Sequence, residues 1–327
     1  IIADTLPDSA AALLREQGWT VDSRAGRPLP ELLHDIADAD GLIVRSATKV
    51  TKELITAAPQ LRIVARAGTG VDNVDLSAAD ENGILVVNAP GVNSISVAEH
   101  ACALLLALSR HIAIADSQMK RGLWEKKSLQ GAELRGKTLG ILGLGRIGCE
   151  VARRAAAFEM TVVAHDPFIS VQLADDLAVE LLSLDELRAR SDYITLHIPS
   201  TATTTQLIDR AWLAQCKPGV RIVNTARGDL IDEAALLEGL TTNQVAGAAL
   251  DVFQVEPPID QELTGHPHVV ATPHIAASTK EAQELVGVET ATCVRDFLMS
   301  GMVRNAVNFP TVSPEESKHL QPYMLLA

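Results

Sequence analysis

Three side chains that can handle a proton or an anion stand near the ends of predicted strands in the second half of the sequence. They are Arg227, Glu256 and His274. A histidine suits proton transfer near neutral pH because its ordinary pKa is about 6.5, and a carboxylate beside it would raise that pKa and orient the ring. An arginine keeps its proton and suits the anchoring of a substrate carboxylate. Together the three residue types fit the removal of a proton and a hydride from a secondary alcohol.

Each of these residues also has an ordinary structural explanation. His274 lies in a predicted turn after a proline, Glu256 precedes two prolines as a helix-capping acid would, and Arg227 can form a surface ion pair. The sequence does not show that the three side chains meet. The proton-transfer interpretation therefore depends on the elements that position them.

A glycine-rich turn joins a predicted strand to a predicted helix in the middle of the chain. Residues 138–142 form an apolar run of strand length, and Gly143, Gly145 and Gly148 follow with the spacing G-x-G-x-x-G. From Ile147 onward, apolar residues recur at helical spacing. In a dinucleotide-binding unit the first glycine permits a tight turn, the second lets the backbone approach a pyrophosphate, and the third allows close helix–strand packing. The order of elements favours this interpretation over a glycine-rich turn that binds nothing.

An acidic residue completes the dinucleotide-binding pattern. A second apolar run, residues 161–164, leads to Asp166, eighteen residues after Gly148. A carboxylate at this place can accept hydrogen bonds from both ribose hydroxyls of an adenosine, and its charge would repel a 2′-phosphate. His165 precedes the acid, but a neutral histidine does not reverse this preference. The pattern predicts NAD rather than NADP.

Composition and charge restrict the class of protein. The chain has 327 residues, of which 47% are hydrophobic and 3% aromatic, as is typical of α/β layers. The formal net charge of −13 argues against a nucleic-acid or anionic-membrane partner. There is no membrane-length apolar run. His266 and His268 lack supporting ligands, so we expect no metal site.

The cysteines are far apart in the sequence and form no C-x-x-C pair. They are Cys102, Cys149, Cys216 and Cys293. This usage predicts reduced, mostly buried thiols and a cytoplasmic protein.

Short apolar runs alternate with helical patterns along the whole chain, which predicts an α/β protein with two doubly wound parallel-sheet (Rossmann-like) domains and a cleft between them. Beyond the two runs already given, strands are predicted at residues 1–3, 41–44, 63–65, 85–87, 193–196, 221–224, 247–251 and 269–272. Helices are predicted at residues 9–17, 29–36, 96–110, 184–190 and 233–240.

Polar residues follow three predicted strands among the first ninety residues. Arg45 and Ser46 follow the second strand, residues 66–70 follow the third, and residues 88–94 follow the fourth. Parallel sheets bind ligands at the carboxyl ends of their strands. The fixed fork of donors on Arg45 suits a phosphate or a carboxylate, although a surface ion pair is the alternative.

Several motifs resemble those of the D-2-hydroxyacid dehydrogenase family. They are R-S-A-T-K-V-T at 45–51, R-A-G-T-G-V-D-N-V-D at 66–75, N-S-I-S-V-A-E at 93–99, G-L-G-R-I-G at 143–148, N-T-A-R-G at 224–228, A-L-D-V-F at 249–253, V-E-P-P at 255–258 and P-H-I-A-A-S-T-K-E-A at 273–282. The resemblance covers essentially the whole chain. The first two motifs are most similar to those of members that act on 3-phosphoglycerate.

The resemblance implies a reaction and a role for each site residue. The reaction is the NAD-dependent oxidation of 3-phospho-D-glycerate to 3-phosphohydroxypyruvate, the first step of phosphorylated L-serine biosynthesis. His274 would accept the proton and pair with Glu256, and Arg227 would bind the substrate carboxylate. The implied substrate-binding residues are Arg45, Ser46, Gly68, Asn93, Arg227 and His274. The implied cofactor-binding residues are Thr69, Gly143, Gly145, Arg146, Ile147, Gly148, Asp166, Ile198, Thr225, Ala226, Asp251 and Ala277, together with Arg227 and His274.

The resemblance also implies a domain arrangement and an assembly. Residues 1–90 and 276–327 would form a discontinuous substrate-binding domain, and residues 91–275 an NAD-binding Rossmann domain. The last helix would pack back on residues 1–90. A homodimer or homotetramer is implied, with no nucleic acid or membrane as partner.

Two other functions are compatible with the motifs. One is another D-2-hydroxyacid dehydrogenase activity, such as that of a glyoxylate or hydroxypyruvate reductase. The other is a non-catalytic NAD-sensing binding protein similar to the corepressors that resemble this family. Arg45 favours a phosphorylated substrate, because neither alternative needs a cation at that place.

Overall fold

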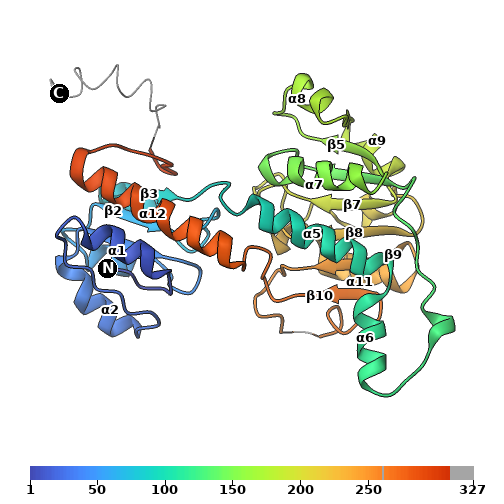
Figure 1. The fold of residues 1–327 in the computed structure, drawn as a ribbon, viewed down its shortest axis with the longest axis horizontal. Coiled ribbons are helices and arrows are strands. Elements are labelled where there is room, and N and C mark those ends of the chain that lie inside the picture. Colours follow the sequence, from blue (N-terminus) through green and yellow to red (C-terminus); the bar gives the residue numbers. More distant parts are fainter. Residues whose placement is uncertain (260, 310–327) are drawn as a thin grey trace. The chain divides into compact units, whose positions relative to one another are not determined.

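The computed structural model describes residues 1–259 and 261–309, and the chain divides into two compact units (Figure 1). Unit 1 comprises Ile1–Asn93 together with the described residues from Thr279 onward, and unit 2 comprises Ser94–Ser278. Unit 2 is therefore one continuous stretch inserted into unit 1. The predicted domain boundaries, after residues 90 and 275, lie close to these divisions.

Unit 1 is built on a small parallel sheet in the order β1-β2-β3. The strands are β1 (Gly41–Val44), β2 (Ile63–Arg66) and β3 (Leu85–Asn88). Beyond β1, Ile2 pairs in parallel with Ile43 on one side and Ser23 on the other. The predicted strand at residues 1–3 is thus reduced to single bridges. The ladder does not continue because the Arg45 N–H bonds the Asp4 side chain instead of a backbone carbonyl.

Helices cover both faces of this sheet. They are α1 (Asp8–Arg15), α2 (Leu29–Asp35), the short 3₁₀ helix η1 (Ile36–Asp38), α3 (Lys52–Thr56), α4 (Leu76–Glu81) and α12 (Lys280–Ser300). Side chains of α1 and α12 pack with Ile43 and Ile63, whereas α2, α3 and α4 pack with Leu42 and Val64. Neighbouring strand residues point to opposite faces, so each strand serves both cores. As the resemblance implies, the last helix returns to the first ninety residues.

Helix α12 approaches α1 closely at one glycine. A Cβ built on Gly287 would lie 2.9 Å from Cδ of Pro7 and 3.5 Å from Cβ of Ala10. The absence of a side chain at Gly287 therefore lets the two helices pack together.

Unit 2 contains a seven-stranded parallel sheet in the order β10-β9-β8-β7-β4-β5-β6. The strands are β4 (Thr138–Leu142), β5 (Thr161–His165), β6 (Glu180–Leu181), β7 (Tyr193–Leu196), β8 (Val220–Asn224), β9 (Val245–Leu250) and β10 (Val269–Ala271). The chain runs outward in one direction from β4 through β6, then in the other from β7 through β10. The boundary between β4 and β7 is a topological switch point, where α/β sheets bind ligands.

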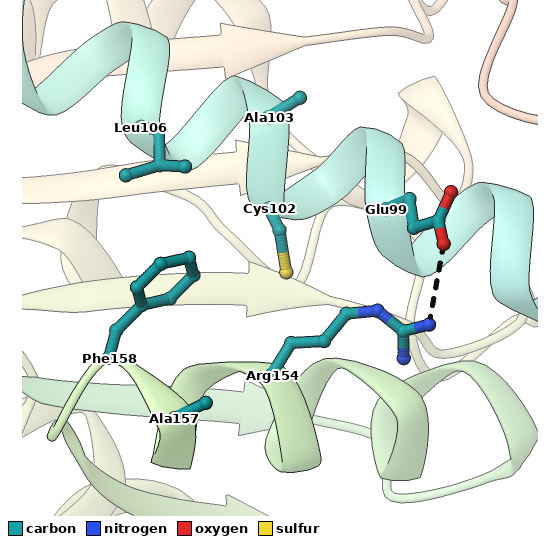
Figure 2. Close-up of a pocket in the computed structure, with 7 residues that line it drawn as sticks. All are labelled: Glu99, Cys102, Ala103, Leu106, Arg154, Ala157 and Phe158. Atoms are coloured by element: carbon teal, nitrogen blue, oxygen red, sulfur yellow. Dashed lines mark ion pairs between the residues drawn. The ribbon is translucent and has the colours of Figure 1, made fainter.

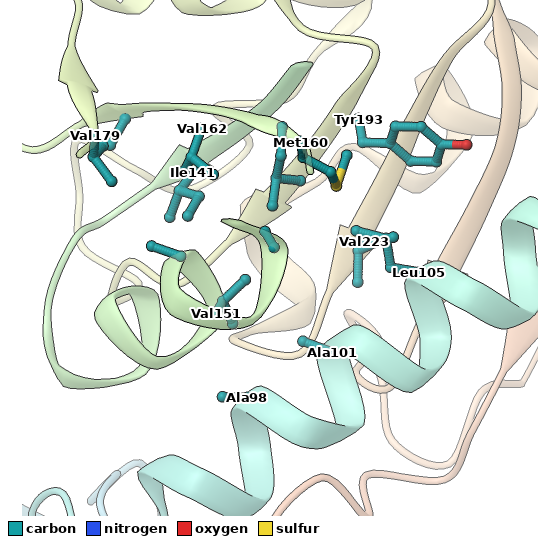
Figure 3. Close-up of a cluster of buried hydrophobic side chains, with 14 of the residues drawn as sticks. Ala98, Ala101, Leu105, Ile141, Val151, Met160, Val162, Val179, Tyr193 and Val223 are labelled. Carbon is teal, nitrogen blue, oxygen red and sulfur yellow. The ribbon is translucent and has the colours of Figure 1, made fainter. Parts of the chain in front are cut away.

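The helices of unit 2 form two layers. They are α5 (Ser94–Ser109), α6 (Ile112–Lys120), η2 (Lys126–Ser128), α7 (Arg146–Ala157), α8 (Val171–Asp176), α9 (Leu184–Arg190), α10 (Arg210–Leu213), η3 (Gly228–Leu230) and α11 (Glu233–Thr241). Ala101, Leu105 and Val151, from α5 and α7, pack against Ile141 and Val223 of the sheet (Figure 3). The other face is covered from α9, α10 and α11.

Several elements were not predicted, among them the helices α3, α4, α6, α8 and α10. The two-residue strand β6 was not predicted, because it offers no apolar run to detect. Strand β9 begins at Val245 rather than at residue 247, and α5 begins at Ser94 rather than at residue 96. In the described part of the chain, no single helix is long and apolar enough to cross a membrane, although α5 and α6, bent by 66°, meet those criteria as a pair.

Candidate active site

The three glycines of the G-x-G-x-x-G motif lie where β4 turns into α7. Gly143 has φ +92°, and a Cβ built there would lie 2.6 Å from the carbonyl oxygen of His197. A Cβ on Gly148 would collide with the carbonyl oxygen of Gly143. A Cβ on Gly145 would meet no atom within 4 Å. The backbone packing thus requires the outer two glycines, whereas the middle one keeps open the space that a phosphate group would enter beside the helix N-terminus.

Asp166 lies directly after β5 and is tied to the glycine turn. One carboxylate oxygen accepts a hydrogen bond from the N–H of Leu144 at 2.9 Å, and the other accepts one from the N–H of Phe168 at 2.9 Å. The Nδ1 atom of His165 is not available to this site, because it donates a hydrogen bond to the carbonyl oxygen of Leu182 at 2.9 Å. The negative charge next to the turn is the feature that disfavours a 2′-phosphate.

His274 and Glu256 form a direct pair. His274 Nδ1 lies 2.7 Å from Glu256 Oε2, and the second oxygen of that carboxylate accepts the N–H of Phe253 at 3.1 Å. Both side chains are partly exposed, His274 at 51% and Glu256 at 36%. Because a carboxylate accepts, Nδ1 carries the hydrogen, which leaves the lone pair of a neutral ring on Nε2. The histidine is held in the tautomer that a general base requires.

The turn that carries His274 is held by a buried carboxylate. Asp251, fully buried, accepts hydrogen bonds from Thr272 Oγ1 at 2.5 Å and from the N–H groups of Ile275 at 2.9 Å and Ala276 at 2.8 Å. His100 Nε2 lies 3.3 Å from the same group. Burial alone would raise the pKa of Asp251, but these hydrogen bonds hold it below its ordinary value. The ionised carboxylate therefore fixes the backbone after His274 and the side chain of Thr272 before it.

Arg227 lies in the loop after β8, and this loop packs against the segment that leads to Glu256. Asn224 shapes the loop, since its side chain donates to the Arg227 carbonyl at 2.8 Å and accepts the Ala226 N–H at 3.0 Å. A Cβ on Gly228 would collide with the carbonyl group of Phe253. The structure thus brings the Arg227 loop and the Glu256 segment together at one edge of the sheet.

The other predicted cofactor residues of unit 2 stand at the same carboxyl edge. Arg146 and Ile147 begin α7, Ile198 follows β7, Thr225 and Ala226 follow β8, and Ala277 follows the His274 turn. The Thr225 hydroxyl is buried and has no partner among the described residues. Thr69 belongs to unit 1, so its cofactor role stays a prediction.

The predicted substrate residues of unit 1 lie in the loops after β1, β2 and β3. Arg45 and Ser46 follow β1, Gly68 follows β2 and Asn93 follows β3. Thr69 Oγ1 and Asn93 Oδ1 are 3.2 Å apart, so the last two loops are linked. At Gly68, with φ +150°, a Cβ would collide with Nη1 of Arg66. This guanidinium thus lies on the Gly68 backbone at the same edge, and Arg66 is one of the residues that the sequence placed after the third predicted strand.

His197 follows β7 beside the glycine turn. Its Nε2 is 3.0 Å from Thr195 Oγ1, and its Nδ1 is buried without a partner among the described residues. Burial lowers its pKa to about 4. Between pH 6.5 and about 4 the unfolded chain therefore binds more protons than the folded one, so the free energy of unfolding should fall as the pH is lowered, by up to about 3 kcal/mol.

Urea unfolding between pH 7.5 and 4.5 tests this prediction. His197→Asn should flatten the acid loss of stability, whereas His34→Asn, at an exposed position, should leave it unchanged. Identical pH slopes for the wild type and His197→Asn would contradict the assignment.

Within the described ranges, no group of three or more His, Cys, Asp or Glu side chains is arranged to hold a metal ion.

Residues 102–276 match the sequence model of the D-isomer specific 2-hydroxyacid dehydrogenase, NAD binding domain. The chain belongs to the D-isomer specific 2-hydroxyacid dehydrogenase family. The glycine turn, the open space at Gly145 and Asp166 all fit the NAD that binds this domain.

Comparison with individual family relatives gives high similarity over the whole chain. It is 47% identical to the D-3-phosphoglycerate dehydrogenase of Archaeoglobus fulgidus over 328 residues, which is 100% of this chain and 62% of that protein. It is 51% identical to the enzyme of the same name from Mycobacterium bovis over 311 residues, which is 94% of this chain and 58% of that protein. The chain thus spans about three fifths of the length of these relatives.

Solved structures show the same fold. The TT0316 protein from Thermus thermophilus matches with a TM-score of 0.85 and 37% identity, covering 94% of this chain and 98% of that one. A glyoxylate reductase from Paecilomyes thermophila matches with a TM-score of 0.84 and 31% identity, covering 96% and 98%. The prediction of a parallel-sheet α/β fold with two sheets is confirmed.

Proposed function

We propose that this protein catalyses the NAD-dependent oxidation of 3-phospho-D-glycerate to 3-phosphohydroxypyruvate, the first step of phosphorylated L-serine biosynthesis. The observation that carries the proposal is the His274–Glu256 pair at 2.7 Å, on the sheet edge that also holds the glycine turn. The names of the relatives at 47 to 51% identity support the choice of substrate.

In this reaction the C2 hydroxyl of the substrate gives its proton to His274 Nε2. Glu256 stabilises the resulting imidazolium, since it already accepts the Nδ1 hydrogen. Asp251 keeps the ring in place by holding the backbone after it. Bound NAD supplies the acceptor for the hydride that leaves C2, so that the alcohol becomes a carbonyl.

Two arginines divide the charged ends of the substrate. Arg227 binds the carboxylate, because its guanidinium offers a fixed pair of donors and cannot lose its proton. Arg45, Ser46 and Asn93 bind the phosphate end. The partial burial of Arg227 and Arg45 strengthens these contacts relative to ion pairs in water.

The substrate is tested by replacing Arg45. Arg45→Ala should lower kcat/KM for the reduction of 3-phosphohydroxypyruvate by about 30- to 150-fold, because one partner of a charged pair worth about 2 to 3 kcal/mol is lost. The rate with glyoxylate should stay within about threefold. The assay follows NADH absorbance and is run from the keto acid, since equilibrium favours the alcohol.

Equal losses for both substrates would contradict a phosphate role for Arg45. A wild-type protein that reduces glyoxylate faster than 3-phosphohydroxypyruvate would instead favour a glyoxylate reductase, the activity named for one of the similar structures. A protein that binds NADH but reduces neither compound would favour a non-catalytic NAD-sensing role.

We also infer that the protein forms a homodimer or homotetramer through unit 2. Leu106 of α5 and Phe158 after α7, each 37% exposed, line a shallow apolar pocket on the surface, with the Glu99–Arg154 pair at one end (Figure 2). Trp124, after α6, is 78% exposed. Apolar surface of this kind favours a protein partner, for which a second copy of the chain is our choice.

We propose a cytoplasmic location as well. All four cysteines are free, and three of them are buried. Free thiols are typical of reducing compartments.

A further inference from the structure

The turn after β1, residues 45–48, is held from two sides by side chains that the sequence analysis did not single out. It carries Arg45 and Ser46, which the proposed function assigns to the phosphate end of the substrate. The two side chains are Asp4 and Asn73, both in unit 1.

Asp4 binds the N–H side of the turn. Its carboxylate is buried, with the residue only 6% exposed. Oδ2 accepts the N–H groups of Arg45 at 2.5 Å and Thr48 at 3.2 Å, and Oδ1 accepts the Thr48 hydroxyl at 2.7 Å. The preceding ladder bonds, from Ile43 to Ile1 and from Ala3 to Ile43, are ordinary backbone bonds of 2.8 and 2.9 Å. The Asp4 carboxylate therefore replaces the next ladder partner and bends the chain away from the sheet at Arg45.

Asn73 binds the carbonyl side. Its Nδ2 donates to the carbonyl oxygens of Arg45 and Thr48, both at 2.6 Å. Asn73 is itself fixed, because its carbonyl accepts the N–H of Val50 at 2.8 Å. One amide group thus ties both ends of the turn to the chain after β2.

These bonds leave a particular set of donors for a ligand. The N–H groups of Ser46 and Ala47 and the Ser46 hydroxyl have no hydrogen-bond partner among the described residues. Both residues are exposed. Arg45 is partly buried, and its Nη1 reaches the carbonyl of Thr5 at 3.4 Å, next to Asp4. The turn thus presents a guanidinium, a hydroxyl and two N–H groups, which suit a phosphate dianion.

We propose that Asp4 and Asn73 are positioning residues that give the site its selectivity for a phosphorylated substrate. Neither contacts the ligand. They act by holding the Arg45–Thr48 backbone in the one conformation that directs its donors to the phosphate. The inference rests on the proposed function, because that function places the phosphate at this turn.

The test compares two substrates that differ only in the phosphate group, 3-phosphohydroxypyruvate and hydroxypyruvate, each reduced with NADH. Asp4→Ala and Asn73→Asp should lower kcat/KM for the phosphorylated acid by about 100-fold, the cost of a donor set misplaced by about 1 Å. The value for hydroxypyruvate should change by less than about threefold. Asn73→Asp is isosteric and sets carboxylate oxygens against the two carbonyls, so it carries the test should Asp4→Ala fail to fold.

Two further variants separate positioning from general damage. Asp4→Asn should retain most of the selectivity, because its amide oxygen can still accept both N–H groups while its NH₂ donates to the Thr48 hydroxyl. Asn308→Ala removes comparable side-chain bonds, to Val86 N at 2.8 Å and Ile84 O at 2.9 Å, near the start of β3. That variant should lose stability without losing selectivity.

If Asp4→Ala and Asn73→Asp leave the ratio of kcat/KM for the two substrates unchanged, the inference is overturned. The proposed function is left intact by that result. If the wild type does not prefer 3-phosphohydroxypyruvate, the proposed function fails. The inference is then decided by calorimetry. It measures the Kd with which the protein–NADH complex binds 3-phosphoglycerate and the Kd with which it binds D-glycerate. A preference lost in the variants would support it, and a wild type without preference would refute it.

Discussion

Replacing His274 with Asn is expected to lower kcat for the reduction of 3-phosphohydroxypyruvate by about 1,000-fold, within the range that general acid–base catalysis contributes. In this direction His274 donates the proton that the new hydroxyl receives. The Asn side-chain NH₂ can still bond Glu256, so the turn after β10 should keep its shape. NADH absorbance gives the rate, and a fluorescence titration gives the Kd for NADH, which should stay within about twofold.

His266→Asn is the matched control, since His266 lies in the loop before β10 and has no part in the proposed reaction. It should leave kcat unchanged. An unchanged kcat in His274→Asn would refute the role of this histidine. A parallel loss of NADH affinity would show that the substitution damages the cofactor site instead.

The second large effect is expected at Arg227. Arg227→Ala should lower kcat/KM for 3-phosphohydroxypyruvate by roughly 30- to 5,000-fold, corresponding to the 2 to 5 kcal/mol lost when one partner of a partly buried charge pair is removed. Arg227→Lys should recover only part of this loss, since an ammonium cannot form the two parallel bonds of a guanidinium to a carboxylate. Steady-state kinetics with both variants measure the effect.

Addition of guanidinium chloride at low millimolar concentration provides an internal check, because a free guanidinium can occupy the space that Arg227→Ala opens. It should raise the rate of that variant and not of Arg227→Lys. Arg221→Ala, at the other end of β8, is the positional control: its guanidinium lies 5.3 Å from the ring centroid of Tyr193, away from the Arg227 loop. Should Arg221→Ala lose as much activity as Arg227→Ala, the anchoring role would be wrong.

The dinucleotide motif could be predicted in detail because its information is local. The glycines of the β4–α7 turn and Asp166 occupy neighbouring segments, and the outer two glycines are required by contacts within that unit or with the adjacent β7 segment. The His274–Glu256 pair was also predicted, by resemblance, and its geometry agrees with a shared role. Residue type and spacing were sufficient for the dinucleotide motif, whereas the pairing of His274 with Glu256 was predicted only from the resemblance.

The supporting contacts could not be predicted, because they join segments that are far apart in the sequence. His100 on α5 lies beside Asp251, which follows β9. Asp4, which precedes α1 in the sequence, binds the turn at Arg45, which follows β1. An aspartate near an N-terminus or a histidine on an apolar helix has no local pattern that reveals such a partner. These contacts depend on the order of the strands in the sheet, because that order decides which strand ends lie side by side.

The late return of α12 has a consequence for biosynthesis. Helix α1 is made before unit 2, but the helix that covers it near Gly287 is made only after the whole of unit 2 has been synthesised. At a translation rate of about 5 to 20 residues per second, the apolar side of α1 stays uncovered for about 15 to 55 s. The inserted unit can therefore reach its native state first. The segment that carries α1 is accessible to a chaperone during that interval.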